Sequence, residues 1–463
     1  MIGGWVKAMT IAVLMVAPAS ARIPAHALCI DADNDGRGVG CPRGADADDS
    51  DPSTASTDDL LAWMKRNDYH PEVIYYVSPD GDDSLAAPDD PRRPYATIPA
   101  AMRRLRGGSC IVLREGQWKG DRLIAAYGLK APKNRPAIVL AMPGERAVLK
   151  ASSSCVEMRN CTNIVIDGAV LTTIAGGGHG VKINDCQRIT LRNLEVFSLS
   201  RGIFGAQDIN NLLIERCVVR DNGGSHGIYL GSRDRPNSNI VIRDCLVYRN
   251  AMHGIQHNGR IRQLVIEGNS VHSNTHGGLS MLQGVCGAMI RGNTVFNNNK
   301  QAVIFFCYDD KPNSGIIAYD QNDNIVEDNI LWVGRYDWRK QTEQPAQHAA
   351  IEMRDGTAAQ IIEMNNNVFR RNIIVTVQGA PAAFSRPSLA AGTTFIDNTF
   401  FRADGPQRVI DCRQQWHDIT AAAGLCAGFT GNVFARPDFA DVSVTYSNTP
   451  ELFDFSLPAQ GGR

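Results

Sequence analysis

The sequence predicts an all-β chain wound into a solenoid of stacked parallel sheets, and three repeating features lead to this fold class. Apolar triplets recur along the chain, and the last residues of successive triplets lie 25, 23, 28, 24 and 24 positions apart. A small polar or thiol residue stands three positions after most triplets, and a strand that begins with glycine completes each unit. One such unit cannot bury a core alone, so the units must stack.

Each repeat contains three short strands separated by Asn and Gly turns. The triplets occupy residues 164–166, 189–191, 212–214, 240–242, 264–266 and 288–290. The column that follows them holds Asn193, Cys217, Cys245, Asn269 and Asn293, and the second strands end at Asn222, Asn250, Asn274 and Asn298. In coils stacked about 4.8 Å apart, buried Asn amides can hydrogen-bond to the next coil. Cys161 with Cys186, and Cys217 with Cys245, are expected to be stacked core thiols; disulfides between coils are the less favoured alternative.

The start of this region carries a further pattern, in residues 75–83 (YYVSPDGDD), 94–101 (PYATIPAA) and 111–118 (IVLREGQW). With these segments and the repeats, residues 73–435 resemble the right-handed parallel β-helix superfamily of pectate lyases, alginate lyases and epimerases, and polygalacturonases. The resemblance implies a right-handed single-stranded parallel β-helix with a short N-terminal capping helix and an Asp-rich N-terminal loop. The chain lacks the Asp pairs of polygalacturonases and the Asp-Pro-His motif of alginate epimerases, so the resemblance implies a fold rather than one activity.

Composition and charge narrow the class of protein. With 43% hydrophobic and 21% charged residues, the chain can bury a large core. Its net charge of -1 argues against a nucleic-acid-binding protein, which would usually be strongly basic. Residues 1–27, with Lys7 before an apolar run, are typical of a signal peptide cleaved after Ala21 or Ala27. No segment is long and apolar enough to span a membrane. We therefore expect a secreted or periplasmic monomer, with a tail at residues 436–463.

Residues 28–60 form an acidic head with nine Asp and two Arg. Alternating carboxylates on a Gly-turned loop can converge on calcium, which takes six to eight oxygen ligands. The segment resembles the metal-binding motif of thrombospondin type 3-like calcium repeats, although Ala47 stands where that pattern has a cysteine. The alternative is a solvated acidic linker. The predicted calcium ligands are Asp31, Asp33, Asp35, Asp46, Asp48 and Asp49.

Twelve cysteines in an exported chain favour some pairing, because the compartment is oxidising. The local pairs that we predict are Cys29 with Cys41, and Cys412 with Cys426.

The Gly-started strands align polar side chains in two outward columns, which favours an extended polar ligand such as a polysaccharide. One column holds Lys182, Phe204, Tyr229 and Gln256, and its neighbour holds His179, Arg201, His226, His253, His276 and Gln301. Insertions at residues 231–239 and 307–323 interrupt the repeat at a similar position within the coil. We expect these loops to form the wall of a groove beside the two columns. The net charge of +4 on the remainder of the chain is mildly favourable for an acidic substrate.

Eliminative cleavage of a uronic-acid polymer needs a cation for the carboxylate, a base for the C5 proton and an acid for the leaving oxygen. We assign His226 or His253 as base, Tyr229 as acid, and Arg233 with Lys182 as carboxylate partners. The predicted substrate-binding residues are Gln256, His257, His276, Arg235 and Lys311. The alternatives are imidazoles that only hydrogen-bond the coil, a zinc or copper site, and a non-catalytic glycan-binding or surface-structural protein. Glycosidase chemistry would need paired carboxylates, and only Asp309 and Asp310 suggest them.

Overall fold

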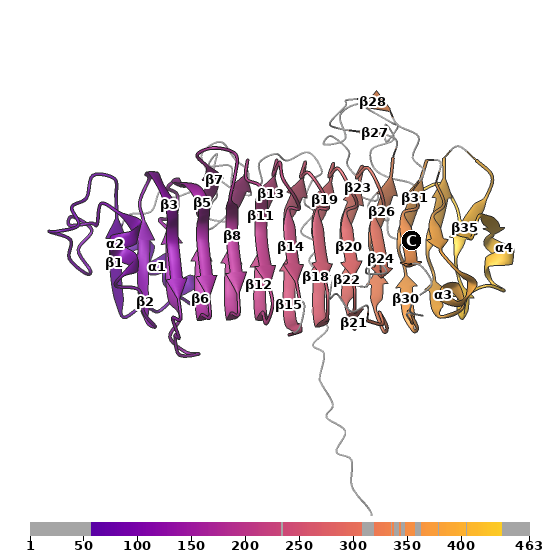
Figure 1. Cartoon of the computed structure of the whole chain (residues 1–463), viewed down its shortest axis with the longest axis horizontal. Helices are drawn as coiled ribbons and strands as arrows, with labels where there is room; N and C mark the ends of the chain where they lie inside the picture. The colour runs from indigo at the N-terminus through magenta and orange to yellow at the C-terminus, as the bar shows by residue number, and fades with distance from the viewer. Residues whose placement is uncertain are drawn as a thin grey trace, which may run out of the picture.

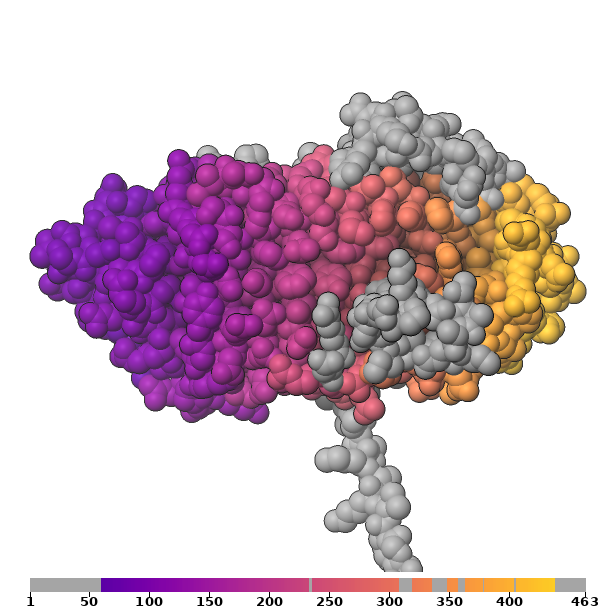
Figure 2. All heavy atoms as spheres, in the orientation of Figure 1, coloured from indigo at the N-terminus to yellow at the C-terminus, as the bar shows by residue number. Residues whose placement is uncertain are grey.

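The computed structural model describes residues 57–232, 235–307, 319–334, 336–337, 342–343, 348–356, 363–377, 379–403 and 405–437. The predicted signal peptide, the calcium ligands, the Cys29–Cys41 pair, Arg233 and Lys311 lie outside these residues. The described residues form one elongated body, coloured from indigo to yellow along its length (Figure 2). Within this part of the chain, no helix is long and apolar enough to cross a membrane.

The predicted parallel β-helix is confirmed: strands of successive coils stand side by side along the body (Figure 1). Each full coil contributes one strand to each of three faces. The first face is a parallel sheet in which each strand pairs with those of the coils before and after it. Its strands are β1 (Val73–Val77), β2 (Ser109–Leu113), β4 (Ala137–Ala141), β6 (Thr162–Asp167), β9 (Gln187–Arg192), β12 (Asn210–Glu215), β15 (Asn237–Arg243), β18 (Ile261–Glu267), β22 (Met289–Arg291), β25 (Ile325–Glu327), β30 (Asn367–Arg370), β33 (Thr393–Ile396) and β37 (Gly428–Thr430), with β21 (Val285–Cys286) beside β18.

The second and third faces share the long strands β3 (Gly116–Tyr127) and β5 (Ala147–Arg159), because the start of β5 pairs with β7 and its end with β8. The second face continues through β7 (Val170–Thr173), β10 (Glu195–Phe197), β13 (Val218–Arg220), β16 (Leu246–Tyr248), β19 (Ser270–His272), β23 (Thr294–Phe296), β26 (Ile330–Val333), β31 (Ile373–Thr376), β34 (Thr399–Arg402) and β38 (Val433–Phe434). The third face continues through β8 (His179–Asn184), β11 (Arg201–Ala206), β14 (Ile228–Gly231), β17 (Ile255–Asn258), β20 (Leu279–Leu282), β24 (Val303–Cys307), β29 (Ile351–Asp355), β32 (Ala382–Phe384) and β35 (Arg408–Cys412).

Short helices accompany the coils at both ends of the body. Helix α2 (Ile98–Met102) is the predicted capping helix, and the Thr97 side chain accepts a hydrogen bond from its third residue. Helix α1 (Thr57–Arg66) packs Leu60, Trp63 and Met64 against the outer side of the first face. The C-terminal coils carry α3 (Pro387–Ala391), α4 (Ile419–Ala422) and β36 (Gln415–Asp418), which is antiparallel to β35. A separate hairpin joins β27 (Tyr336–Asp337) and β28 (Thr342–Glu343).

The predicted Asn column is a buried hydrogen-bonded ladder. The Nδ2 of Asn269 donates to the Oδ1 of Asn293 at 2.9 Å, and the Nδ2 of Asn293 donates to the Oδ1 of Asn329 at 2.9 Å. The glycines directly before β14, β17 and β20 make room for a similar ladder. A Cβ on Gly254 would lie only 2.8 Å from the Nδ2 of Asn274 and 2.4 Å from a methyl group of Val271.

A second ladder on the first face alternates negative and positive charge from coil to coil. Its register runs in the order Asp167, Arg192, Glu215, Arg243, Glu267, Arg291, Glu327 and Arg370. Arg243 lies 2.6 Å from Glu215, and Arg370 lies 2.6 Å from Glu327. Opposite charges in adjacent rungs are favourable and like charges are not. These arginines are therefore committed to the scaffold.

The cysteines behave partly as predicted. All ten cysteines in the described ranges are free thiols, and Cys161, Cys186, Cys217 and Cys245 are buried in adjacent coils as expected. The predicted disulfide between Cys412 and Cys426 is wrong. Cys412 points into the core from β35, whereas Cys426 follows α4 and is only partly buried. Burial, and after it the neighbouring Cys412, raises the pKa of Cys426 to about 12, so the two thiols are neighbours without a bond.

Candidate functional site

A cavity of about 440 Å³ lies on the third face, over β11 and β14. Strand residues supply its floor, and the segments before and after β14 supply its two ends. The volume is in the range of pockets that hold small ligands. Its lining residues are Arg201, Phe204, Ala206, Gln207, Ser225, His226, Tyr229, Gly231, Ser232 and Asn258.

The floor of the cavity is aromatic. Phe204 and Tyr229 occupy the same register position on adjacent coils, so both rings stand outward. They stack with centroids 5.5 Å apart and planes 5° from parallel, and the His226 ring lies 5.1 Å from Tyr229. The Nδ2 of Asn258 donates a 3.4 Å hydrogen bond to the Oη of Tyr229. The result is a flat apolar surface with polar groups at its edges.

Arg201 is the cation of the cavity. Its guanidinium lies 5.3 Å from the centroid of the Phe204 ring, and its Nη1 is 3.3 Å from the Nε2 of His179. No carboxylate of the described residues lies within ion-pair distance of it. Most outward arginines of the scaffold have such a partner, as Arg243 and Arg370 do. Arg201 is thus a positioned positive charge that can accept an anion.

The histidines form a ladder held by the backbone. The N–H of His253 donates to the Nδ1 of His226 at 3.2 Å, and the N–H of Gly277 donates to the Nδ1 of His253 at 3.0 Å. The rings of His226 and His253 stack at 5.5 Å. A neutral imidazole that accepts through Nδ1 carries its proton on Nε2. Both rings therefore present a hydrogen-bond donor at Nε2, as expected for imidazoles that hydrogen-bond the coil.

The environment keeps these imidazoles neutral. Burial lowers the pKa of His226 to about 4, and the charges of His276 and Arg201 act in the same direction. Burial is the main cause that lowers the pKa of His253 well below its ordinary value, and the neighbouring His226 acts in the same direction. Burial and Arg201 lower the pKa of His179 to about 4. Arg201 is then the cation that lines the described part of the cavity.

The structure brings only part of the predicted site together. His226 and Tyr229 line the cavity; Lys182 lies one coil before Phe204, with its Nζ 3.6 Å from Glu157. Gln256 lies one coil after Tyr229 and is buried, and the ring of His276 lies 5.3 Å from that of His253. Arg235 is committed to ion pairs with Asp185 and Asp208 at the turn side of the coil. The predicted roles of these residues stay predictions.

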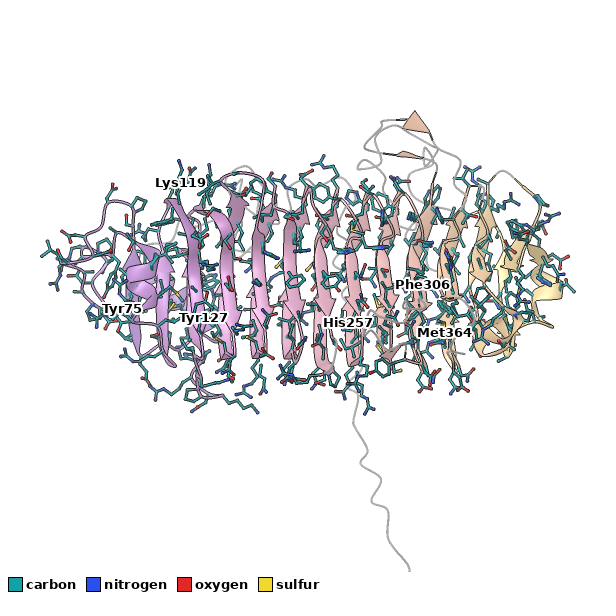
Figure 3. The ribbon with its side chains drawn as sticks, viewed as in Figure 1. Tyr75, Lys119, Tyr127, His257, Phe306 and Met364 are labelled. Atoms are coloured by element: carbon teal, nitrogen blue, oxygen red, sulfur yellow. The ribbon has the colours of Figure 1, made fainter. Side chains whose placement is uncertain are left out.

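The prediction that His257 lies in the groove is wrong. It lies on β17, midway along the body (Figure 3), and follows outward Gln256, so it points inward. Its register neighbours in the adjacent coils are Leu230 and Met281. It is 2% exposed, and burial lowers its pKa to about 3. The alternation of a β-strand requires this orientation, since successive side chains face opposite sides.

Carboxylates are absent from the described lining of the cavity, which contains no Asp or Glu. Across the described ranges, no group of three or more His, Cys, Asp or Glu is arranged to hold a metal ion. The two carboxylates that glycosidases place on either side of a sugar are therefore not found among these lining residues.

Eight of the ten lining residues received no role from the sequence, among them Arg201, Phe204, Ser232 and Asn258. Arg201 and Phe204 stand in the two outward columns, so the columns indicated their position. They did not indicate that Arg201 has no carboxylate partner in the described ranges. Ser232 and Asn258 lie near the end of third-face strands, where a count from the repeated glycine would have found them. Histidines were weighted above the amide and hydroxyl groups beside them.

Comparisons with known proteins agree with this architecture. The family model described as right-handed beta helix region matches residues 146–295 and 255–415. No curated protein matches the sequence.

Among solved structures, the GH136 lacto-N-biosidase of Eubacterium ramulus is 14% identical with a TM-score of 0.51, covering 82% of this chain and 70% of that one. The A-module of the Azotobacter vinelandii mannuronan C-5 epimerase AlgE4 is 16% identical with a TM-score of 0.46, over 68% of this chain and 91% of that one. Pectate lyase Pel9A is 16% identical with a TM-score of 0.44, over 64% of this chain and 79% of that one. At these identities the likeness concerns the fold alone. With more than half of its length matched by the family model, the chain belongs to the family of proteins that contain a right-handed β-helix region.

Proposed function

We propose that this protein is exported, binds an acidic polysaccharide on its third face and cleaves it by elimination. The observation that carries the proposal is Arg201, a guanidinium at an aromatic cavity with no carboxylate partner among the described residues. A uronic-acid unit has a carboxylate that suits Arg201 and a ring face that suits Phe204 and Tyr229. The resemblance of the fold to carbohydrate-active β-helix proteins supports this assignment only by analogy.

The lining residues suggest a division of roles. Arg201 would neutralise the sugar carboxylate, which acidifies the C5 proton. The basic nitrogen of His226 is already hydrogen-bonded to the backbone of His253, so His226 would act as an Nε2–H donor rather than as the base. Tyr229 is then the group left to move the proton: as phenolate it would take the C5 proton and return it to the leaving oxygen as the C4–O bond breaks and the C4–C5 double bond forms.

One observation favours the second candidate, a non-catalytic glycan-binding protein. The histidines of the ladder serve the backbone through Nδ1, so the cavity has no free basic imidazole nitrogen at His226 or His253. Under this alternative the aromatic floor and Arg201 would bind sugar without chemistry.

The test is incubation with pectate, alginate and glucuronic-acid polymers, followed by the ultraviolet absorbance of unsaturated uronate. We expect release from one of these polymers, rising with pH because a phenol ionises only in alkaline solution. Tyr229→Phe should lower turnover about 100-fold or more with little change in binding. Tyr248→Phe removes a phenol from the second face and is the matched control. Binding without release in the wild type would select the second candidate, and neither binding nor release would refute both.

A further inference from the structure

A row of partly exposed polar side chains continues from the cavity along the third face. Hydrogen bonds between adjacent coils fix its order, since the N–H of Lys300 donates to the oxygen of His276 at 3.3 Å, and the N–H of His253 donates to the Nδ1 of His226 at 3.2 Å. Each coil from that of β11 to that of β24 therefore presents an accessible polar group. The members of this polar row, one from each coil, are Arg201, Tyr229, His253, His276 and Lys300.

The middle of the polar row consists of imidazoles. His253 accepts through Nδ1 from the N–H of Gly277 at 3.0 Å, so the neutral ring carries its proton on Nε2 and can donate it to a ligand. The ring of His276 lies 5.3 Å from that of His253. The central outward column offers no accessible side chain at the same coils, because Gln256 is 5% exposed and Ser280 is 0% exposed. A polymer on this part of the face would therefore contact the imidazoles.

Lys300 is the cation at the far end of the polar row. No carboxylate of the described residues lies within ion-pair distance of it. Burial is the main cause that lowers the pKa values of His253 and His348, and the charge of Lys300 acts in the same direction on both. Together with its hydrogen bond to the backbone of His276, this indicates that the ammonium lies beside the imidazoles. Lys300, like Arg201, is available to an anion.

The two cations are separated by a defined distance along the body. Their coils are connected in register from β11 through β14, β17 and β20 to β24, which is a step of four coils. At about 4.8 Å per coil, their backbones are roughly 19 Å apart. One unit of an extended polysaccharide is about as long as one coil is high. A chain that lies parallel to the axis would thus place its first unit at Arg201 and its fifth at Lys300.

We propose that the polar row continues the binding site, so that the protein binds an internal stretch of at least five units of an acidic polysaccharide. Arg201 would bind the carboxylate of the first unit and Lys300 that of the fifth. The imidazoles of His253 and His276 would lie along the units between them. This inference rests on the proposed function and adds the length and direction of the bound chain.

Binding by chain length tests the polar row. Trisaccharides and pentasaccharides of galacturonate, mannuronate and glucuronate, with their parent polymers, are titrated into the full-length protein by calorimetry. A trisaccharide reaches one cation and a pentasaccharide reaches both, so one pentasaccharide should bind about tenfold more tightly than its trisaccharide, the effect of one charge-assisted hydrogen bond. Additional binding registers alone would give about threefold, because a pentasaccharide contains three overlapping trisaccharides.

A gain no greater than this statistical factor, or binding by the polymers alone, would overturn the polar row and leave the proposed function standing. Absence of binding by every trisaccharide, pentasaccharide and polymer would overturn both.

A matched set of variants tests Lys300. Lys300→Gln should bring the Kd of the pentasaccharide to within about threefold of that of the trisaccharide, whose own Kd should change less than about twofold. Lys300→Arg keeps the charge and should keep the gain. Lys150→Gln is the control, since Lys150 is a partly exposed lysine of β5 on the second face, and it should change neither Kd. A gain that persists in Lys300→Gln, with the melting temperature of the wild type, would overturn the assignment of Lys300.

Discussion

Arg201→Gln removes the positive charge on which the proposed binding mode depends. A charge-assisted hydrogen bond contributes about 1.5–3 kcal/mol, which corresponds to roughly 10- to 150-fold in Kd. We expect the upper half of this range, because the guanidinium is already held 5.3 Å from the Phe204 ring and 3.3 Å from the Nε2 of His179. Little side-chain ordering then remains to be made on binding.

Calorimetric titration with a uronate trisaccharide measures this loss directly. Arg235→Gln is the control, since Arg235 is an arginine of the same region that is already paired with Asp185 and Asp208, and its substitution should change Kd less than twofold. The stability of Arg201→Gln should be close to that of the wild type, because Arg201 makes no ion pair with the residues that the structure describes. A loss of affinity below about threefold, or an equal loss in Arg235→Gln, would refute the role of Arg201.

Three further predictions concern stability. Asn293→Ala leaves the N–H and Nδ2 of buried Asn269 without their acceptor, so guanidinium unfolding should show that the free energy of unfolding falls by roughly 2–6 kcal/mol. Asn134 is exposed, so Asn134→Ala should lower it by less than about 0.5 kcal/mol. Similar values for the two variants would contradict the ladder. Burial lowers the pKa of His272 to about 3 from 6.5, so the unfolded chain binds the proton first and stability is lost as the pH falls below 6.5. His272→Phe, which keeps the stack of rings between Tyr248 and Phe296, should therefore retain about 2 kcal/mol more of its neutral-pH stability at pH 5 than the wild type, and parallel pH profiles would refute this. If residues 28–60 bind calcium, a chelator should lower the melting temperature of the full-length chain, and calorimetry should detect calcium binding. The double variant Asp33→Asn, Asp48→Asn should abolish both effects. A wild-type protein that binds no calcium would refute the site.

The repeat made the scaffold predictable. Each coil places equivalent residues in equivalent environments, so the spacing of the apolar triplets and of Asn269 and Asn293 was enough to identify stacked coils and a buried amide ladder. The same alternation, applied to β17, would have placed His257 inside the coil. That error came from weighing residue type above strand phase. The Cys412–Cys426 prediction failed because proximity in sequence does not determine where two side chains point.

The chemistry of the cavity was less accessible from the sequence. Whether an outward arginine is free depends on which side chain occupies the same rung of the next coil and on how the turns are arranged. The sequence does not distinguish Arg235 from Arg201 in this respect, yet among the described residues Arg235 has two carboxylate partners and Arg201 has none. The direction of the imidazole hydrogen bonds likewise depends on the backbone of the following coil.

The sequence by itself determined the class of fold, the coil length and the face on which polar columns stand, because these follow from local periodicity repeated in every coil. Only the tertiary structure decided which column members meet in one cavity and which charges are already paired. Those features arise from contacts between segments that are not separated by a regular number of residues. No repeating pattern in the sequence therefore predicts them.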